Sequence, residues 1–178
     1  MRSSGGPTPG QFLILTGSYA TLRLTGGTVL NVMWTERQPF MVLVDDDVHS
    51  ARLMSRMLLA HGAPSIEWVD QTDAGLSKIK IALSGTNMSI LGLVIVDLKA
   101  SSTATTDFVA KVSELDPRRD IPLVAMVRDG DRSCRDRLLG AGAHAVFERK
   151  ADLHDYRAEA AAIVRFWVRN QHLEAVGT

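Results

Sequence analysis

From residue 39 onward the chain alternates short apolar runs with longer segments whose apolar residues recur at helical spacing. The short runs are rich in β-branched residues, which is typical of strands buried on both faces. This pattern predicts strands at 40–45, 66–69, 92–97, 122–127 and 145–148. It predicts helices over about 48–61, from an N-cap at Asp73 to near Gly85, from a cap at Asp107 or a neighbouring Thr to before Pro117, and over about 130–140 and 152–174.

Regular alternation of strands and helices predicts an α/β fold, a doubly wound five-stranded parallel sheet. Right-handed crossovers leave few topologies for such a sheet. The order 2-1-3-4-5 places the first and third strands side by side, at the switch point where such sheets bind ligands.

The first 38 residues differ from the rest. Residues 2–10 are small and rich in Gly and Pro, which predicts poor order. Residues 20–25 and 28–32 alternate in polarity around Gly26-Gly27, which predicts a hairpin that is marginal on its own. We interpret residues 1–38 as a disordered extension, a weak hairpin or a misassigned leader, and residues 39–176 as one domain.

Acidic residues follow two of the predicted strands. Asp45, Asp46 and Asp47 come directly after one apolar run, and Asp97 ends the run 91–96. Since an unpaired buried charge is costly, these acids must emerge at the carboxyl ends of their strands. Clustered carboxylates repel one another unless a cation lies between them, and hard divalent cations prefer oxygen ligands. We therefore expect a Mg²⁺ site here, although acids also end strands simply as turn formers.

Composition narrows the function. The 20 basic and 20 acidic residues cancel, which argues against nucleic-acid binding. The single cysteine, Cys134, excludes an intramolecular disulfide and suits a reducing cytosol, so we expect a cytoplasmic protein. No apolar stretch approaches the roughly 20 residues that a membrane span needs, and the N-terminus lacks the pattern of a signal peptide.

The sequence resembles the receiver domain of two-component response regulators, the CheY-like family. The resemblance covers about residues 39–174. It rests on four segments, namely Val42–Asp47, Leu93–Asp97, Ile121–Ala125 and Gly140–Ala143.

This resemblance implies a flavodoxin-like, CheY-like sheet and a phosphoacceptor at Asp97. It implies Mg²⁺ held by Asp46, Asp97 and the backbone carbonyl of Lys99, with Asp45 acting through water. The phosphoryl donor would be a sensor histidine kinase or a histidine phosphotransfer protein, and the signal would pass to a protein target. A homodimer through helix 130–140, strand 145–148 and helix 152–174 is a further implication. Asp47 is expected to start the first helix.

The sequence departs from the family where the signal is read out. Val127 stands where the family has Ser or Thr, so the hydroxyl that bonds the phosphoryl group is missing. Arg149 stands in the place of the family's Lys, unless a one-residue shift brings Lys150 there instead. Val146 stands where the family has a rotating aromatic side chain. The loop after Asp97 is longer than usual, and its hydroxyl groups are an alternative source of the missing donor (Ser101, Ser102 and Thr103).

These departures leave alternatives to a phosphorylated receiver. A phosphorylation-independent pseudo-receiver, acting as a protein-binding module, is favoured by Val127 and Arg149. An aspartate-nucleophile phosphatase would need an acid two residues after Asp97, where Lys99 stands. A flavin-binding protein would need a phosphate-cradling loop, where three acids would instead repel the phosphate. We expect no enzymatic activity beyond self-catalysed phosphotransfer and dephosphorylation.

Overall fold

The computed structural model describes residues 13–16, 19–23, 29–33, 38–85 and 90–174. The chain divides into two compact units, Met1–Arg37 and Gln38–Thr178.

The first unit contains a three-stranded antiparallel sheet in the order β1 (Leu13–Thr16), β2 (Tyr19–Arg23) and β3 (Val29–Met33). The antiparallel pairing of β2 with β3 is the hairpin that the alternation predicts. Strand β1 was not predicted, because its four residues alone give too short a pattern. The disorder expected at residues 2–10 and the turn at Gly26-Gly27 lie outside the described residues.

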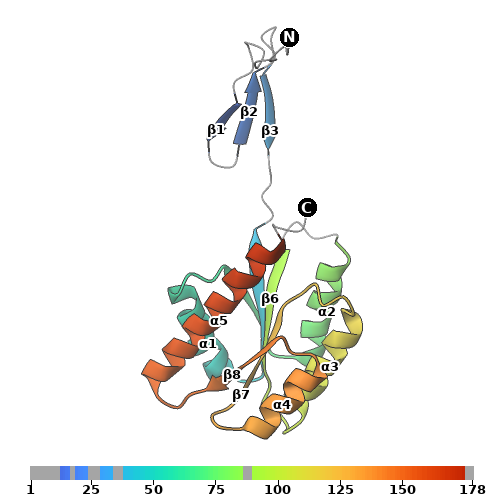
Figure 1. Ribbon diagram of the computed structural model, residues 1–178, viewed down its shortest axis with the longest axis vertical. Helices are drawn as coiled ribbons and strands as arrows, with labels where there is room; N and C mark the ends of the chain where they lie inside the picture. The colour runs from blue at the N-terminus through green and yellow to red at the C-terminus, as the bar shows by residue number, and fades with distance from the viewer. Residues whose placement is uncertain (1–12, 17–18, 24–28, 34–37, 86–89, 175–178) are drawn as a thin grey trace, which may run out of the picture. The chain divides into compact units, whose positions relative to one another are not determined.

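The second unit is a five-stranded parallel sheet with helices on both faces (Figure 1). Its strands lie in the order β5-β4-β6-β7-β8, which confirms the predicted order 2-1-3-4-5. The elements in chain order are β4 (Pro39–Asp45), α1 (Val48–Ala60), β5 (Ser65–Val69), α2 (Thr72–Leu83), β6 (Ile90–Asp97), α3 (Ala104–Leu115), β7 (Leu123–Arg128), α4 (Arg132–Ala141), β8 (Ala145–Arg149) and α5 (Leu153–Glu174).

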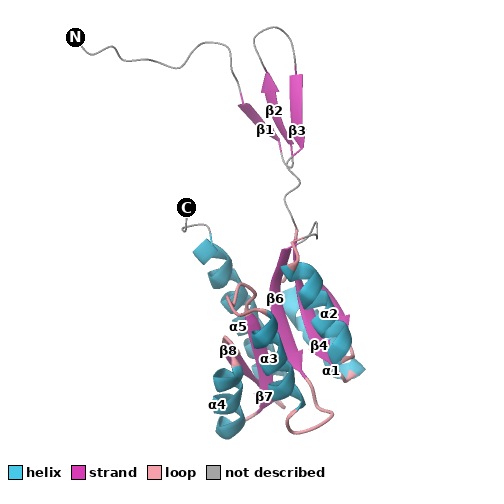
Figure 2. Cartoon of the chain, turned by 90° about the vertical axis from the view of Figure 1, so that its right-hand side faces the viewer, coloured by secondary structure: helices cyan, strands magenta, loops and turns pink. Residues whose placement is uncertain are grey.

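Side chains alternate across the sheet, which builds one apolar layer on each face. In β4, Val42 and Val44 pack in the layer formed with α2, α3 and α4, whereas Met41 and Leu43 pack in the layer formed with α1 and α5. Figures 1 and 2 show these two groups of helices on opposite sides of the sheet. Because helices cover both faces, the three inner strands β4, β6 and β7 are almost continuously apolar and buried.

The register of β4 against β6 positions the acids. The pairing shifts at the start of β4, where Phe40 pairs with Leu91 and Met41 pairs with Leu93. From that irregularity onward the pairing is regular to the ends of both strands, and Asp45 lies opposite Asp97. The two acids therefore end neighbouring strands at the same edge of the sheet.

At two helix starts, the acid that the sequence offers as an N-cap lies inside the first turn. Helix α2 begins at Thr72 with Gln71 as its N-cap, so Asp73 lies inside the first turn instead of capping it. Helix α3 begins at Ala104, so its N-cap is a threonine, Thr103, and Asp107 lies in its first turn. An acid in the first turn favours the helix dipole as well as a cap would, so residue type alone does not separate the two positions. None of the helices in the described ranges is both long and apolar enough to span a bilayer.

Candidate functional site

The site centres on Asp45 and Asp97, two acids buried at the carboxyl ends of β4 and β6. Asp45 is 0% and Asp97 1% exposed. Two carboxylates so fully removed from water need cations close by, because neither retains the hydration that a surface acid keeps.

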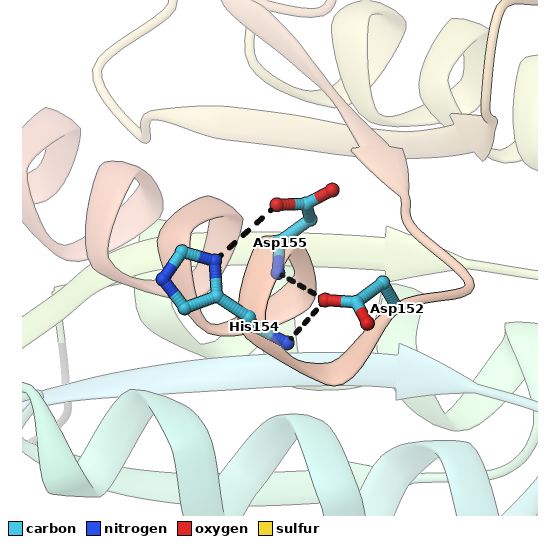
Figure 3. Close-up of side chains that lie close together, drawn as sticks. All are labelled: Asp152, His154 and Asp155. Carbon is cyan, nitrogen blue, oxygen red and sulfur yellow. Dashed lines mark hydrogen bonds and ion pairs between the residues drawn. The ribbon is translucent and has the colours of Figure 1, made fainter.

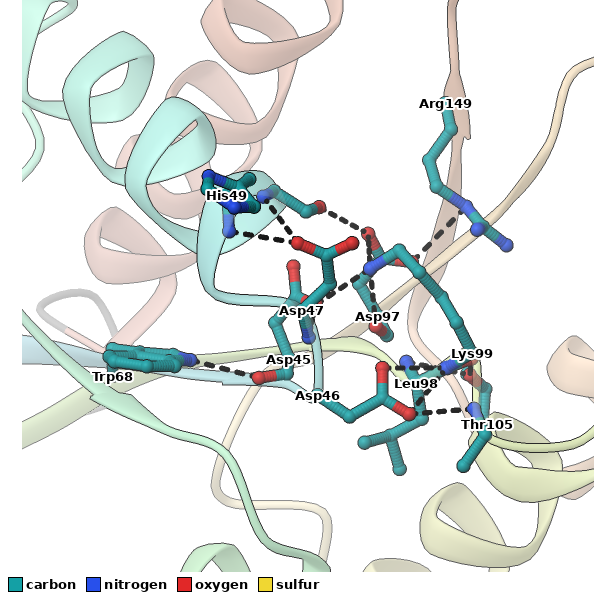
Figure 4. A network of polar contacts seen from close by, with 12 residues as sticks. Asp45, Asp46, Asp47, His49, Trp68, Asp97, Leu98, Lys99, Thr105 and Arg149 are labelled. Carbon is teal, nitrogen blue, oxygen red and sulfur yellow. Dashed lines mark hydrogen bonds and ion pairs between the residues drawn. The ribbon is translucent and has the colours of Figure 1, made fainter.

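Lys99 supplies the first cation. Its side chain turns back from the loop after β6 and places the ammonium between the two acids (Figure 4). The Nζ atom lies 2.6 Å from Asp45 Oδ1, 3.0 Å from Asp97 Oδ2 and 3.0 Å from the Asp97 carbonyl oxygen. The contacts with Asp45 Oδ1 and with the Asp97 carbonyl are hydrogen bonds, and the contact with Asp97 Oδ2 is an ion pair.

Arg149 supplies the second cation. At the end of β8, its Nε lies 3.1 Å from Asp97 Oδ1. Lys150 instead pairs with Asp129, at 2.6 Å, and with Glu148. Of the two registers left open by the sequence, the structure therefore places Arg149 against Asp97.

Burial dominates the electrostatics of Asp97. Loss of hydration raises the pKa of this carboxyl, and the nearby charges of Lys99 and Arg149 lower it only in part. Tyr156 on α5 is affected by the same acids. Its pKa is raised, first by burial and then by the charges of Asp97 and Asp45, so the phenol stays protonated.

Asp46 lies in a different arrangement from the one expected. Its two carboxylate oxygens accept hydrogen bonds from the Lys99 amide, both at 2.9 Å, and Oδ2 also accepts one from the Ala100 amide at 2.6 Å. The Lys99 carbonyl and the Ala100 N–H belong to the same trans peptide, in which the C=O and the N–H point in opposite directions. Because the Ala100 N–H points at Asp46, the Lys99 carbonyl points away from that carboxylate. In this geometry Asp46 and the Lys99 carbonyl do not face one common ion.

Hydrogen bonds fix the loop that carries Lys99. The Thr105 hydroxyl accepts from the Leu98 amide at 3.1 Å and donates to the Leu98 carbonyl at 3.0 Å. Thr105 is itself buried. The residue before Lys99 is therefore held on both sides of its backbone, and the lysine begins from a defined position.

The first turn of α1 closes the other side of the site. Asp47 is the N-cap, as expected, and accepts from the amides of His49 and Ser50. Its own amide donates to Asp45 Oδ1 at 2.9 Å. The Ser50 hydroxyl lies 3.4 Å from Asp97 Oδ2, within donating distance.

The edge strand β5 also contacts the site. The indole Nε1 of Trp68 donates to the carbonyl oxygen of Asp45 at 2.9 Å. A tryptophan bonded to the backbone of a site acid also provides a local fluorescence signal.

The donor set suits a hard divalent cation. Among the described residues, the buried oxygens Asp45 Oδ2 and Asp97 Oδ1 accept no hydrogen bond, and Asp97 Oδ1 has only its ion pair with Arg149. Carboxylate oxygens are the ligands that Mg²⁺ and Mn²⁺ prefer. Asp45 and Asp97 therefore fit such an ion, and Asp46 would join them only if it released the loop amides.

A cavity of about 330 Å³ lies beside the acids, between the loops after β6 and β7. Lys99 and Arg149 line it, together with the hydroxyl-rich residues Ser101 and Ser102. Val127 also lines it and is 1% exposed, so an apolar wall stands at the position where the resemblance implies a hydroxyl. Asp97 does not line this cavity, whereas both cations that contact it do.

A second acidic group lies at the start of α5. Asp152, His154 and Asp155 have ligand atoms within 4.8 Å of one another, and all three are exposed (Figure 3). Asp152 Oδ1 accepts from the amides of His154, at 2.7 Å, and of Asp155, at 3.2 Å. These bonds are those of a helix start, which accounts for the cluster without a metal.

Sequence reasoning missed three residues that shape the site. Thr105 and Ser50 each lie near the start of a helix, where hydroxyl groups commonly cap, so no pattern sets them apart. Tyr156 lies on α5, far from the acids in sequence, and no pattern marks it as a site residue. The structure shows that its side chain is buried.

Of the comparisons with known proteins, the one with solved structures finds matches. No family model matches the sequence, and no curated protein matches it. Solved structures do match in fold. A response regulator from Hahella chejuensis has a TM-score of 0.60 at 18% identity, covering 72% of this chain and 94% of that chain.

Two further solved structures match this chain in fold. The phosphorylated cyanobacterial phytochrome response regulator RcpA has a TM-score of 0.61 at 16% identity, over 74% of this chain and 94% of that one. The Mn²⁺-bound form of response regulator Rcp1 has a TM-score of 0.57 at 16% identity, over 72% and 93%. At such identities the likeness shows the fold, which is the CheY-like fold of receiver domains.

Proposed function

We propose, since the chain has the fold of a response regulator receiver domain, that it accepts a phosphoryl group on Asp97 and signals through protein–protein contacts. The observation that carries this proposal is the arrangement around Asp97. The acid lies opposite Asp45, with Lys99 on one carboxylate oxygen and Arg149 on the other.

The chemistry is a displacement at phosphorus. An oxygen of the Asp97 carboxylate bonds to the phosphorus of a phosphohistidine, the P–N bond breaks, and the released imidazole takes up a proton. Such transfers depend on positioning and charge neutralisation more than on covalent assistance. Asp45, Asp97 and, after rearrangement, Asp46 would hold Mg²⁺, which neutralises the phosphoryl oxygens when bound.

Arg149 is the residue that would hold the transferred group. It already contacts the acceptor carboxylate, and its guanidinium can bind phosphate oxygens through a planar fork. Val127 has no hydrogen-bond donor in its side chain, so no bond from this position to the phosphoryl group would move the loop after β7. We expect the conformational response to run through the charges of Lys99 and Arg149 instead.

The donor is proposed to be a sensor histidine kinase or a histidine phosphotransfer protein, and the receiver of the signal another protein. Exposed leucines on α4 and α5 support a partner surface there: Leu139 is 41% and Leu153 49% exposed. A homodimer through α4, β8 and α5 would use the same surface. We propose a cytoplasmic location, with no nucleic acid or membrane partner.

A second candidate is a pseudo-receiver that binds partners without phosphorylation. The observation favouring it is that Lys99 and Arg149 already balance the charges of Asp45 and Asp97. Buried acids whose charges are balanced without metal or phosphate can stabilise the fold without taking part in phosphoryl transfer. Val127 supports the same reading.

Incubation with acetyl phosphate and Mg²⁺, read by intact mass, separates the two candidates. The receiver proposal expects wild type and Asp107→Asn to gain one phosphoryl group and Asp97→Asn to gain none. Asp107 lies in the first turn of α3 and is exposed, so it is a matched control acid. A wild type that stays unlabelled with this donor and with a phosphohistidine protein would support the pseudo-receiver.

A further inference from the structure

We propose that the Lys99 ammonium is a built-in counter-ion that competes with divalent metal for Asp45 and Asp97 and must leave before the metal site forms. This inference rests on the proposed function, because it concerns how the same acidic site is regulated.

The position of the ammonium carries the first step. Its three contacts are two carboxylate oxygens and one carbonyl oxygen, at 2.6, 3.0 and 3.0 Å. These are also the oxygen types that bind Mg²⁺. The Lys99 side chain is 27% exposed, whereas the side chains of Asp45 and Asp97 are 0% and 2% exposed. The ammonium is therefore seated between the acids and covers them.

Charge balance carries the second step. Asp45 and Asp97 contribute two negative charges, which the two positive charges of Lys99 and Arg149 balance, and Asp46 adds one further negative charge that the loop amides bind. A divalent ion added beside a retained ammonium would leave an excess of positive charge around the buried acids, where cations a few ångströms apart repel one another. Metal binding is therefore coupled to departure of the ammonium.

The surrounding backbone carries the third step. Asp46 is occupied by the amides of Lys99 and Ala100, so the loop that carries Lys99 also withholds this acid from a metal. Departure of the lysine and release of Asp46 involve the same loop. The flexible lysine stem can swing toward the adjacent cavity, which Lys99 already lines.

The test measures metal affinity without any phosphoryl donor. Mn²⁺ and Mg²⁺ are titrated into the whole chain by calorimetry, with Trp emission as a second signal. Lys99→Gln is expected to bind metal at least about tenfold more tightly than wild type, and Lys99→Arg is expected to stay weak. Lys78→Gln is the matched control, because Lys78 forms an exposed pair with Glu67 at 2.6 Å, and its affinity should equal that of wild type.

Equal or weaker affinity in Lys99→Gln would overturn the inference and leave the phosphoacceptor proposal standing. Absence of metal binding in every variant would overturn the inference together with the metal-dependent function.

A second readout uses wild type alone and covers the case in which Lys99→Gln does not fold. Acylation of lysine amines, followed by peptide mass spectrometry, should label Lys99 several-fold faster once metal is added, with Lys78 unchanged. Labelling of Lys99 that is fast without metal, or insensitive to it, would refute the competition.

Discussion

The guanidinium Nε of Arg149 lies 3.1 Å from Oδ1 of Asp97, at the end of β8. This contact puts a permanent positive charge beside the proposed phosphoacceptor, where the charge of the transferring group would develop. Arg149 therefore supplies a cation at the position where the resemblance implies a lysine.

Removing this charge should slow phosphorylation. Arg149→Ala is expected to lower the rate of labelling by acetyl phosphate on the order of 10²-fold, since a positioned donor is lost from the transition state. Arg149→Lys should retain part of the rate. Arg132→Ala, an exposed change on α4, is the control and should behave as wild type. Unchanged labelling in Arg149→Ala would exclude a role for this residue in the transfer.

Introducing a hydroxyl at position 127 should lower the stability of the protein and enlarge its conformational response to a phosphoryl mimic. Val127→Thr buries a hydroxyl in an apolar cluster and is expected to lower the free energy of unfolding by about 1–2 kcal/mol. It should also enlarge the change in Trp emission on adding BeF₃⁻ and Mg²⁺. Val124→Thr, equally buried in the other apolar layer, should show the same loss of stability without the larger signal. If the two variants respond alike, Val127 is not the altered switch position.

Gly142 tests the motif on which the resemblance partly rests. Its φ is +118°, and an added Cβ would lie 1.9 Å from Ser113 Oγ, which also bonds the Ala141 carbonyl. Gly142→Ala is therefore expected to lower the free energy of unfolding by about 2–4 kcal/mol, from strain and overpacking together. Gly140→Ala meets open space inside α4 and should raise it by about 0.5–1 kcal/mol. Urea unfolding measures the free energy of unfolding of both variants, and equal changes in Gly142→Ala and Gly140→Ala would contradict the account.

His144 predicts a dependence of stability on pH. Its Nδ1 accepts a hydrogen bond from the Leu123 amide at 3.1 Å. Burial, followed by the charge of Arg119, lowers the pKa of His144 below its usual value. A group with a lowered native pKa stabilises the fold above its unfolded pKa, near 6.5, and this contribution is lost as pH falls through the native pKa.

Thermal unfolding from pH 7.5 down to pH 5 measures that contribution. The wild-type Tm should fall more steeply over this range than the Tm of His144→Gln, which has no titrating ring. His61→Gln, an exposed change, should follow wild type. Parallel curves for wild type and His144→Gln would show that the ring does not titrate differently on folding.

The strand ends could be predicted because burial constrains them strongly. A continuously apolar strand cannot hold Asp45 or Asp97 along its length, so both acids had to lie at its carboxyl end. The topology then brought them together. The same logic identified Asp47 as the start of α1, since an N-cap follows from residue type and position.

The interior of the site could not be predicted in the same way. A lysine side chain after a strand can extend into solvent or turn back, and no local pattern decides between them. Only the assembled site, with two buried acids lacking hydration, favours the inward Lys99. The orientation of the two peptides on either side of Lys99, which directs the Lys99 and Ala100 amides to Asp46, likewise depends on the loop as a whole.

The central claim is that Asp97 accepts the phosphoryl group, and mapping the modified residue tests it most directly. Wild type is treated with acetyl phosphate and Mg²⁺, and the acyl phosphate is then reduced with borohydride, which converts a phosphorylated aspartate to homoserine. Peptide sequencing by mass spectrometry should find homoserine at position 97 and aspartate at positions 45 and 46. Homoserine at another acid, with position 97 unchanged, would contradict the account.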